Sequence, residues 1–364
     1  MSLHDHTYAV IMAGGVGSRF WPMSRSGSPK QFLDILDRGR TLIQMTADRL
    51  QPMLPYERMY VVTNVRYKDE VMAQLPSLPE DQILCEPFMR NTAPCLAYAH
   101  HRIGQKDPEA TIIVASADHL IEDEAGFRDV LGVAVKQAAT TDQLLTLGIS
   151  PTRPDTGYGY IQYEGLSGAF DSRLQQVRTF TEKPNRALAE EFIASGDFCW
   201  NSGIFIWSLA TIQARFEAQL PDLQSLFVER SGDLGTAREA EAIREIFGAA
   251  ENISIDYGIM EGAPNVGVVL GDFGWSDLGT WGSLYDKLEK DPQGNALSGV
   301  DLIAEGASGL MVAGDGNKLV VVKGMQDFII VDTPDALLLC PRDEEQWVKQ
   351  LVSRLKADRG EPLV

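Results

Sequence analysis

A glycine-rich stretch with two cations nearby gives the clearest indication of chemistry in this sequence. Three glycines between positions 14 and 17 follow the apolar run 8–11, which we predict to be the first buried strand. Glycines let the backbone turn sharply and approach a ligand closely. Successive backbone N–H groups in such a loop can converge on phosphate oxygens. We therefore predict a cradle for a nucleotide triphosphate, formed by Gly14, Gly15, Gly17, Ser18, Arg19 and Lys30.

Two other phosphate-binding motifs do not fit this loop. The dinucleotide fingerprint G-x-G-x-x-G would begin at Gly15, but Phe20 occupies its third glycine position, which disfavours a nicotinamide oxidoreductase. The Walker pattern G-x-x-x-x-G-K-[ST] occurs nowhere in the chain. The remaining alternative is a tight strand-to-helix turn whose glycines serve packing alone.

A carboxylate that follows a strand could hold a metal ion, and Asp118 is such a carboxylate. Asp118 follows the predicted strand 111–115 directly, and Asp277 lies in the segment 274–281. Mg²⁺ takes one or two carboxylates together with phosphates and waters. The net charge of −19 favours this interpretation, because so acidic a protein needs a metal to bring anionic substrates together. The alternative is that each aspartate caps a helix.

Composition and charge exclude several other functions. The chain of 364 residues is 44% apolar and 23% charged, as expected for a soluble globular protein. Its negative charge argues against binding to nucleic acid or to an anionic membrane. No signal peptide is evident, and no apolar stretch reaches the ~18 residues that a membrane helix needs. The four cysteines form no C-x-x-C pair, so we expect reduced thiols and a cytoplasmic protein.

Strands and helices alternate through the first half of the chain. The strand patterns are apolar throughout, which is typical of a mostly parallel sheet covered by helices on both faces. We therefore predict a Rossmann-like α/β fold with ligands at the carboxyl ends of the strands. The predicted strands are 8–11, 59–63, 83–86 and 111–115, and the predicted helices are 41–50, 66–75, 91–102 and 124–139.

The strands lengthen and begin to alternate after residue 157, which suggests a sugar-binding half without a separate linker. We therefore expect one catalytic domain over residues 1–290. Short strands separated by turn residues follow, and they predict a small sandwich or β-helix that ends in a helix at 343–356. We assign residues 291–364 to this second, β-rich domain. The sequence leaves open whether it packs on the catalytic domain or forms the contact of a homodimer.

These motifs resemble those of the sugar-nucleotide pyrophosphorylases. The similarity rests on GGxGxRxWPxSR at 14–25 and PKQF at 29–32, and it extends from about Tyr8 to Trp281. The Trp21-Pro22 pair and the PKQF block resemble the mannose-1-phosphate guanylyltransferases. The resemblance implies the nucleotide-diphospho-sugar transferase fold. It also implies that GTP and mannose 1-phosphate react to give GDP-mannose and pyrophosphate.

The resemblance further implies roles for residues in the second half. Lys183 matches the family's E-K-P lysine, which grips the sugar phosphate, and Glu182 would accept hydrogen bonds from sugar hydroxyls. Without the resemblance, these two residues would be taken for a solvated ion pair. The metal ligands of the family match Asp118 and Asp277, which implies Mg²⁺ as cofactor. The remaining residues assigned to the sugar phosphate are Tyr158, Gly159, Asn201 and Asp277.

The segment 86–94 resembles the base-recognition segment of the same family. Guanine presents two donors, N1–H and the 2-amino group, and one carboxylate can accept both; we assign this role to Glu86. Asn91 and Thr92 belong to the same nucleotide-binding segment. The alternative is a helix N-terminus that Asn91 caps.

The implied reaction needs no general base, because the attacking phosphate oxygen is already ionised at neutral pH. Catalysis would rest on positioning and on neutralisation of charge. Arg19 and Lys30 would stabilise the departing pyrophosphate, Lys183 would hold the attacking phosphate, and Asp118 would bind the metal. Two alternatives stay open: another pair of sugar 1-phosphate and nucleotide, and a catalytically silent regulatory relative. The family's long bacterial members carry a fused isomerase domain, and we predict no such second activity here.

Overall fold

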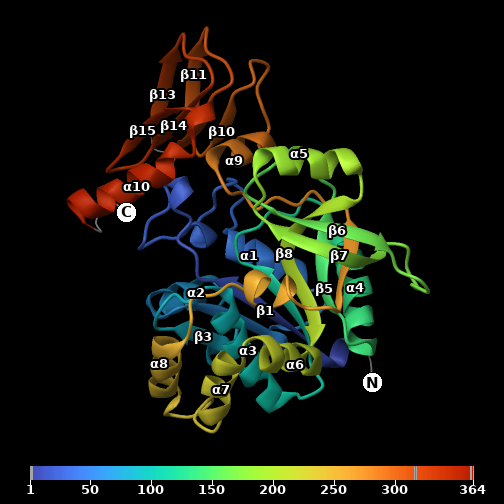
Figure 1. Cartoon of the computed structure of the whole chain (residues 1–364). Helices are drawn as coiled ribbons and strands as arrows, with labels where there is room; N and C mark the ends of the chain where they lie inside the picture. Colours follow the sequence, from blue (N-terminus) through green and yellow to red (C-terminus); the bar gives the residue numbers. More distant parts are fainter. Residues whose placement is uncertain (1–2, 315, 317, 361–362, 364) are drawn as a thin grey trace. The chain divides into compact units, whose positions relative to one another are not determined.

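A computed structural model describes residues 3–314, 316, 318–360 and 363 of the chain (Figure 1). Its internal contacts divide these residues into two compact units. Unit 1 draws its described residues from Met1–Gly14, Thr46–Ala117 and Ile121–Trp275. Unit 2 draws its described residues from Gly15–Met45, Asp118–Leu120 and Ser276–Val364. The domain boundary expected between residues 290 and 291 remains a prediction.

A nine-stranded mixed sheet forms the centre of unit 1, in the order β3-β2-β1-β4-β8-β5-β9-β7-β6. The first four strands pair in parallel, as their apolar patterns predict, whereas β8 runs antiparallel between β4 and β5. This arrangement confirms the α/β fold. The strands are β1 Thr7–Ala13, β2 Met59–Asn64, β3 Ile83–Glu86, β4 Thr111–Ser116, β5 Leu144–Ile149, β6 Gly159–Gly165, β7 Leu174–Glu182, β8 Phe198–Ser208 and β9 Val266–Gly271.

Helices supply the rest of the core of unit 1. Residues of α3, α6, α7 and α8 share one buried apolar cluster with β1, β2 and β4. Within it, the Trp207 Nε1–H donates to His100 Nε2 at 3.1 Å. The helices are α2 Lys68–Gln74, α3 Thr92–Lys106, α4 Glu124–Thr140, α5 Arg186–Ser195, α6 Leu209–Gln219, α7 Pro221–Glu229, α8 Glu239–Ala249 and the single π-turn η7 Asp256–Met260. Helix α1, Leu42–Leu50, begins in unit 2 and ends in unit 1.

Unit 2 contains the β-rich end of the chain. Its strands pair in parallel within a four-stranded sheet, β10-β12-β14-β15, and a two-stranded sheet, β11-β13; only β15 is antiparallel among the strands described there. Parallel pairing of successive short strands agrees with the β-helix alternative. The elements are α9 Trp281–Lys287, β10 Ala296–Ser298, β11 Asp301–Glu305, β12 Met311–Gly314, β13 Leu319–Lys323, β14 Phe328–Asp332, β15 Leu337–Pro341 and α10 Trp347–Arg359.

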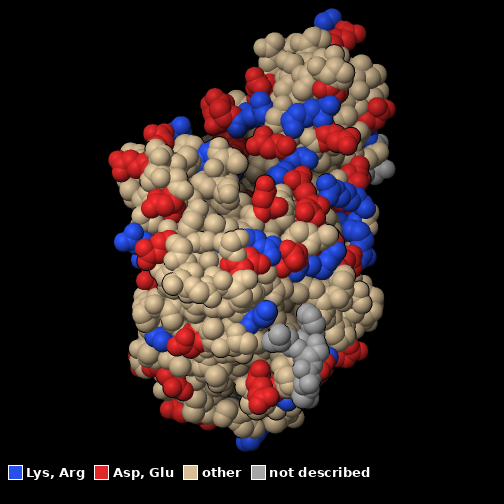
Figure 2. Space-filling model, turned by 90° about the vertical axis from the view of Figure 1, so that its right-hand side faces the viewer, with Lys and Arg blue, Asp and Glu red and all other residues tan. Residues whose placement is uncertain are grey.

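Several one-turn helices connect these elements. The single turns are η1 Leu3–His6, η2 Ser18–Phe20, η3 Lys30–Phe32, η4 Tyr56–Arg58, η5 Val65–Tyr67, η6 Glu80–Gln82 and η8 Arg342–Glu344. Figure 2 shows basic side chains interspersed with acidic ones, so the net charge of −19 forms no continuous acidic surface on the described part of that face. Among the described residues, every helix is too short or too polar to cross a membrane.

Candidate active site

The predicted residues fall into two groups, one inside each unit. In unit 2, Lys30 is almost fully buried by the glycine loop, with 3% of its surface exposed. Gly17 adopts a φ of 68°, and a Cβ added there would overlap Lys30 Cβ. Packing and backbone conformation therefore both require glycine at this position. By contrast, a Cβ added at Gly15 would meet nothing within 4 Å, so packing does not require glycine at position 15.

The Lys30 ammonium contacts both predicted metal ligands. Its Nζ donates to Asp118 Oδ2 at 2.9 Å and to the backbone oxygen of Asp277 at 2.7 Å. The Phe20 ring lies beside it, with its centroid 5.5 Å from Nζ. Loss of hydration opposes the charge on Asp118, but the Lys30 ammonium helps to outweigh that effect, and the pKa of Asp118 lies below its ordinary value. Thus Asp118 is a carboxylate at neutral pH.

The structure rules out the helix-cap alternative for these two aspartates. Thr280 caps α9 through a capping box with Ser283, while Asp277 Oδ1 accepts the N–H of Gly279 at 3.0 Å, before that helix begins. Helix α4 is capped by Asp123, whose Oδ1 accepts the Gly126 N–H at 2.9 Å. Asp118 stands before that cap and pairs with Lys30 instead.

The donor set suits a magnesium ion that also binds phosphate. Side-chain and backbone oxygens of Asp118 and Asp277 are hard ligands, and 34% of the Asp118 side chain remains exposed. The described residues contain no group of three or more His, Cys, Asp or Glu placed to hold a metal by themselves. Mg²⁺ commonly binds through one or two carboxylates and completes its coordination with substrate phosphates and waters. Asp118 and Asp277, which both contact Lys30 beside the glycine loop, fit that pattern.

Arg19 lies in the turn η2 and is directed to the C-terminal part of unit 2. Its Nε donates to Oε1 of Gln346, the residue before α10, at 3.4 Å. Ser18 begins the same turn, and its backbone oxygen accepts the Trp21 N–H at 3.2 Å. The phosphate-binding roles of Ser18 and Arg19 remain predictions.

In unit 1, a buried carboxyl group lies at the end of strand β3. Glu86 is 5% exposed, and its Oε1 has no hydrogen-bond partner among the described residues. Burial raises the pKa of Glu86 to about 8, and the nearby Cys95 thiol lowers it only in part. A Cβ added at Gly14, the first loop glycine, would lie 3.7 Å from Glu86 Oε2. A buried acceptor without a partner calls for an explanation, and a ligand that donates hydrogen bonds would supply one.

Asn91 and Thr92 form the start of helix α3. Asn91 has a φ of 66° and caps the helix, since its Oδ1 accepts the Thr92 N–H at 3.0 Å. The Thr92 hydroxyl accepts the Ile255 N–H at 2.8 Å. The cap proposed as an alternative for Asn91 is therefore confirmed, and nucleotide binding by these two residues stays a prediction.

Strands β6, β7 and β8 bring the predicted sugar residues together. Gly159 pairs directly with Glu182, and a Cβ at position 159 would lie 2.5 Å from Glu182 Oε2 and 3.3 Å from Asn201 Cβ. Asn201 is 8% exposed. Its Oδ1 accepts the Thr146 hydroxyl at 2.9 Å, and its Nδ2 donates to Asp256 Oδ1 at 3.0 Å. Glycine at position 159 therefore leaves space beside a carboxylate and a buried amide.

Lys183 and Tyr158 border this group. Lys183 adopts a φ of 51°, and its backbone N–H donates to the Tyr158 oxygen at 3.2 Å. Its ammonium pairs with Glu182, and 58% of the Lys183 side chain is exposed against 11% for Glu182. The Tyr158 ring packs edge-on against Trp200 and Trp275, with centroids 5.0 and 5.2 Å away. The three aromatic rings thus pack together, and the ion pair follows Tyr158 across the strand pairing.

Sequence analysis missed one member of this group, Asp256. It begins the π-turn η7, and its carboxylate is fixed by the amide of Asn201. Burial, followed by the negative charge of Glu182, raises the pKa of Asp256 to about 6. A single acid inside an otherwise apolar run was the available signal.

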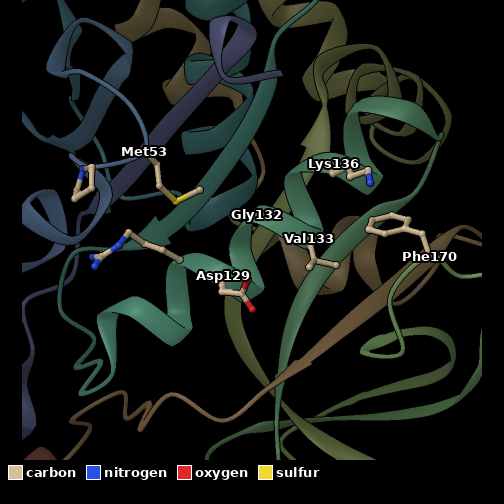
Figure 3. A pocket seen from close by; sticks show the side chains of 8 residues that line it. Met53, Asp129, Gly132, Val133, Lys136 and Phe170 are labelled. Carbon is tan, nitrogen blue, oxygen red and sulfur yellow. The ribbon is translucent and has the colours of Figure 1, made fainter. Parts of the chain in front are cut away.

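A separate cavity of about 440 Å³ opens beside α4 in unit 1 (Figure 3). Met53, Val133 and Phe170 contribute apolar lining, and the Lys136 ammonium lies 4.2 Å from the centre of the Phe170 ring. The residues predicted for the active site are absent from its described lining. This cavity is therefore distinct from both groups described above.

Comparison with known proteins identifies the families that the chain matches. The model of the family described as "Nucleotidyl transferase" matches residues 8–294, and that of the "MannoseP isomerase/GMP-like beta-helix domain" matches residues 303–355. Mannose-1-phosphate guanylyltransferase of Klebsiella pneumoniae is 36% identical over 354 residues, which cover 96% of this chain and 74% of that protein. Alginate biosynthesis protein AlgA of Pseudomonas aeruginosa is 36% identical over 353 residues, with coverage of 96% and 72%.

A solved structure extends the similarity to three dimensions. The crystal structure of mannose-1-phosphate geranyltransferase from Thermus thermophilus superposes with a TM-score of 0.87 at 32% identity. The match covers 96% of this chain and 99% of that one. Both the α/β part and the β-rich end are thus shared with that protein.

Proposed function

We propose, from the premise that this chain belongs to the nucleotidyl transferase family and within it to the mannose-1-phosphate guanylyltransferases, that it makes GDP-mannose and pyrophosphate from GTP and mannose 1-phosphate. One structural observation carries the proposal. The buried Lys30 ammonium contacts the Asp118 carboxylate and the backbone of Asp277 beside the glycine loop. A cation and oxygens that could hold a metal ion thus lie together in unit 2, which supports the proposal for so acidic a protein.

In this proposal, the group in unit 2 binds the triphosphate. Backbone N–H groups of the glycine loop and the side chains of Arg19 and Lys30 neutralise the pyrophosphate as it departs. Mg²⁺ held by Asp118 and Asp277 supplies further positive charge to the phosphates when it is bound. Lys30 also keeps Asp118 ionised, as the lowered pKa of that carboxyl indicates.

The group in unit 1 binds the sugar phosphate and the base. Lys183 holds the phosphate whose oxygen attacks the α-phosphorus, and its exposed ammonium is able to move from Glu182 to a substrate. Glu182, Asn201 and the backbone at Gly159 bind the sugar hydroxyls. Glu86 accepts the two donors of guanine. Its Oε1, which has no hydrogen-bond partner among the described residues, supports this role. Positioning and charge neutralisation then account for catalysis without a general base.

A substrate panel tests the proposed function. Pyrophosphate release is measured with Mg²⁺ for GTP, ATP, UTP and dTTP, each against mannose 1-phosphate and glucose 1-phosphate. We expect the highest kcat/KM for GTP with mannose 1-phosphate, and loss of turnover with EDTA. A maximum at another pair would keep the chemistry but overturn the assignment of Glu86 and of the sugar residues. No release with any pair would favour the catalytically silent relative.

We also propose a homodimer formed through the outer face of β11 and β13. Ile303, Leu319 and Val321 are 49%, 53% and 66% exposed there. The register pairs Ile303 with Val321 and Glu305 with Lys323. A two-fold axis parallel to the strands would therefore place Ile303 on Val321 and Glu305 on Lys323 of the second copy, as an isologous contact requires, while Leu319 would face Asp301.

Light scattering tests the dimer. Val321→Lys should give a monomer because it buries an unpaired charge in the contact. Val228→Lys is the control, since Val228 is a similarly exposed valine (53%) on α7 of unit 1. A wild-type monomer, or a dimer that Val321→Lys leaves intact, would contradict the proposal.

We propose a cytoplasmic location because the cysteines are free thiols and because the proposed substrate GTP is drawn from the cytoplasm. Cys85, Cys95, Cys199 and Cys340 are all free thiols. Disulfides form in secreted proteins and are rare in the cytosol, so free thiols in all four positions support an enzyme that draws GTP from the cytoplasmic pool.

A further inference from the structure

Asp256 is held in place from two sides of unit 1. The segment before it is tied to the start of α3, because the Ile255 N–H donates to the Thr92 hydroxyl at 2.8 Å and the Ala93 N–H donates to the Ile253 oxygen at 3.1 Å. Behind it, the Glu261 N–H donates to the Asp256 backbone oxygen at 2.9 Å and closes the π-turn. Single π-turns occur frequently at functional sites.

The orientation of the Asn201 amide is fixed by its neighbours. Its Oδ1 accepts from the Thr146 hydroxyl at 2.9 Å and from the Gly203 N–H at 3.1 Å, so the amide nitrogen must face Asp256. One N–H of Asn201 is then bound to Asp256 Oδ1. Among the described residues, no other side chain hydrogen-bonds the Asp256 carboxylate. The Asp256 backbone N–H also hydrogen-bonds this carboxylate. A carboxylate has about four acceptor sites, so about half of its capacity is unused.

A second carboxylate lies close to the first. Glu182 is near enough to raise the pKa of Asp256 together with burial, which is the larger cause, and Lys183 opposes that effect. Two partly buried carboxylates near each other are costly unless donors satisfy them. The Lys183 ammonium pairs with Glu182, and the single Asn201 N–H meets only part of the need of Asp256. A ligand with several neighbouring hydroxyls would supply the missing donors.

We infer that Asp256 binds a hydroxyl of the sugar ring, next to Glu182 and Asn201, and that this contact selects among sugar 1-phosphates. The inference rests on the proposed function and adds a specificity-determining residue to it. A site built to accept a hydroxyl rejects an analogue that lacks it, because the buried acceptor is then left without a partner. Asp256 therefore makes the enzyme sensitive to the removal of one particular hydroxyl.

The test compares Asp256→Asn with wild type on mannose 1-phosphate and on its 2-, 3-, 4- and 6-deoxy analogues. In wild type, the kcat/KM for one analogue should be roughly 10- to 100-fold lower than that for mannose 1-phosphate, as expected for the loss of a hydrogen bond to a charged group. In Asp256→Asn, the kcat/KM for mannose 1-phosphate itself should fall by about the same factor. The kcat/KM of this variant for that same analogue should be little lower still. The KM for GTP should be unchanged in both proteins.

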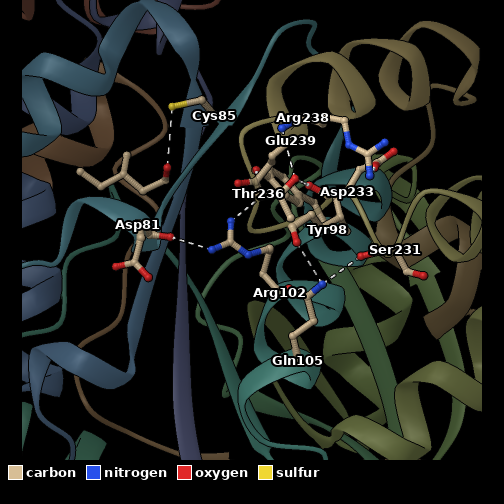
Figure 4. A network of polar contacts seen from close by, with 12 residues as sticks. Asp81, Cys85, Tyr98, Arg102, Gln105, Ser231, Asp233, Thr236, Arg238 and Glu239 are labelled. Carbon is tan, nitrogen blue, oxygen red and sulfur yellow. Dashed lines mark hydrogen bonds and ion pairs between the residues drawn. The ribbon is translucent and has the colours of Figure 1, made fainter.

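Asp233→Asn provides a matched control. Asp233 is an aspartate of unit 1 that is 8% exposed, and it pairs with Arg230 and Arg238 in the polar network between α3 and the segment before α8 (Figure 4). This substitution should lower the melting temperature and leave the sugar profile unchanged. If Asp256→Asn does not fold, Asp256→Glu keeps the charge but displaces the carboxylate, and it should raise the KM for mannose 1-phosphate by the same reasoning.

Calorimetric titration with mannose 1-phosphate separates this inference from the proposed function. A wild-type protein that neither binds nor converts mannose 1-phosphate would overturn both. A wild-type protein that converts it, with Asp256→Asn showing the same sugar profile and affinity, would overturn the inference alone.

Discussion

Replacing Glu86 by glutamine tests the base-recognition assignment through stability as well as activity. Burial raises the pKa of Glu86 from an ordinary 4.5 to about 8. Between these values the folded protein holds a proton that the unfolded chain has released. The contribution to stability is therefore complete below pH 4.5 and is lost as the pH rises through 8. At about 1.36 kcal/mol for each pKa unit, the loss reaches roughly 5 kcal/mol.

Urea unfolding between pH 5 and pH 9 measures this effect. Glutamine does not titrate, so the free energy of unfolding of wild type should fall by several kcal/mol relative to Glu86→Gln over this range. Glu80→Gln serves as control, because the Glu80 side chain is 65% exposed and its replacement should change little with pH. A difference between wild type and Glu86→Gln that stays constant from pH 5 to pH 9 would refute the burial argument.

The same variant tests recognition of guanine. Inosine triphosphate lacks the 2-amino group and so loses one of the two hydrogen bonds that Glu86 would accept. Above pH 8, where Glu86 is ionised, a hydrogen bond to this charged group contributes about 1.5–3 kcal/mol, so wild type should prefer GTP over ITP by roughly 10- to 150-fold in kcat/KM. Glu86→Gln should bring the ratio close to one. An unchanged ratio would assign guanine recognition to another residue.

Two further substitutions probe the group in unit 2. Lys30→Met removes the ammonium that contacts Asp118 and Asp277, so kcat should fall by roughly 10²–10³, as for a lost oxyanion-hole donor. Lys136→Met is the control and should retain full turnover. Equal kcat values for the two variants would exclude Lys30 from the mechanism. Gly17→Ala forces alanine into a φ of 68° and against Lys30 Cβ, so denaturant titration should show a free energy of unfolding lower by about 1–3 kcal/mol. Gly15→Ala is the control and should unfold like wild type. Equal stability of the two variants would contradict the described loop conformation.

The sequence indicated the strands β1–β4 because each is buried on both faces and must be apolar throughout. Strand β5 escaped notice, although its residues are also buried. It contains Gly148, and glycine normally weakens a strand. Here a Cβ would lie 2.6 Å from Cys199 Sγ and 2.7 Å from Val268 Cγ2, so the neighbouring strands require glycine. That requirement depends on partners distant in the chain.

The site residues show the same limit. Asp118 could equally have capped a helix by sequence, and only the pairing with Lys30, 88 positions away, decides against it. Asp277 is 247 positions from Lys30, and the cap of α9 belongs to Thr280 instead. Asp256 was missed because its partner Asn201 lies 55 positions earlier. Motif similarity supplied roles for individual residues, but spatial neighbours across the sheet could not be inferred from local patterns.

The most direct test of the proposed reaction is identification of its products. GTP and mannose 1-phosphate are incubated with the purified protein and Mg²⁺, and the mixture is followed by phosphorus NMR. GDP-mannose and pyrophosphate should appear in equal amounts as both substrates disappear, with no inorganic phosphate. Release of GDP and inorganic phosphate with mannose 1-phosphate unconsumed, or no reaction at all, would contradict the account.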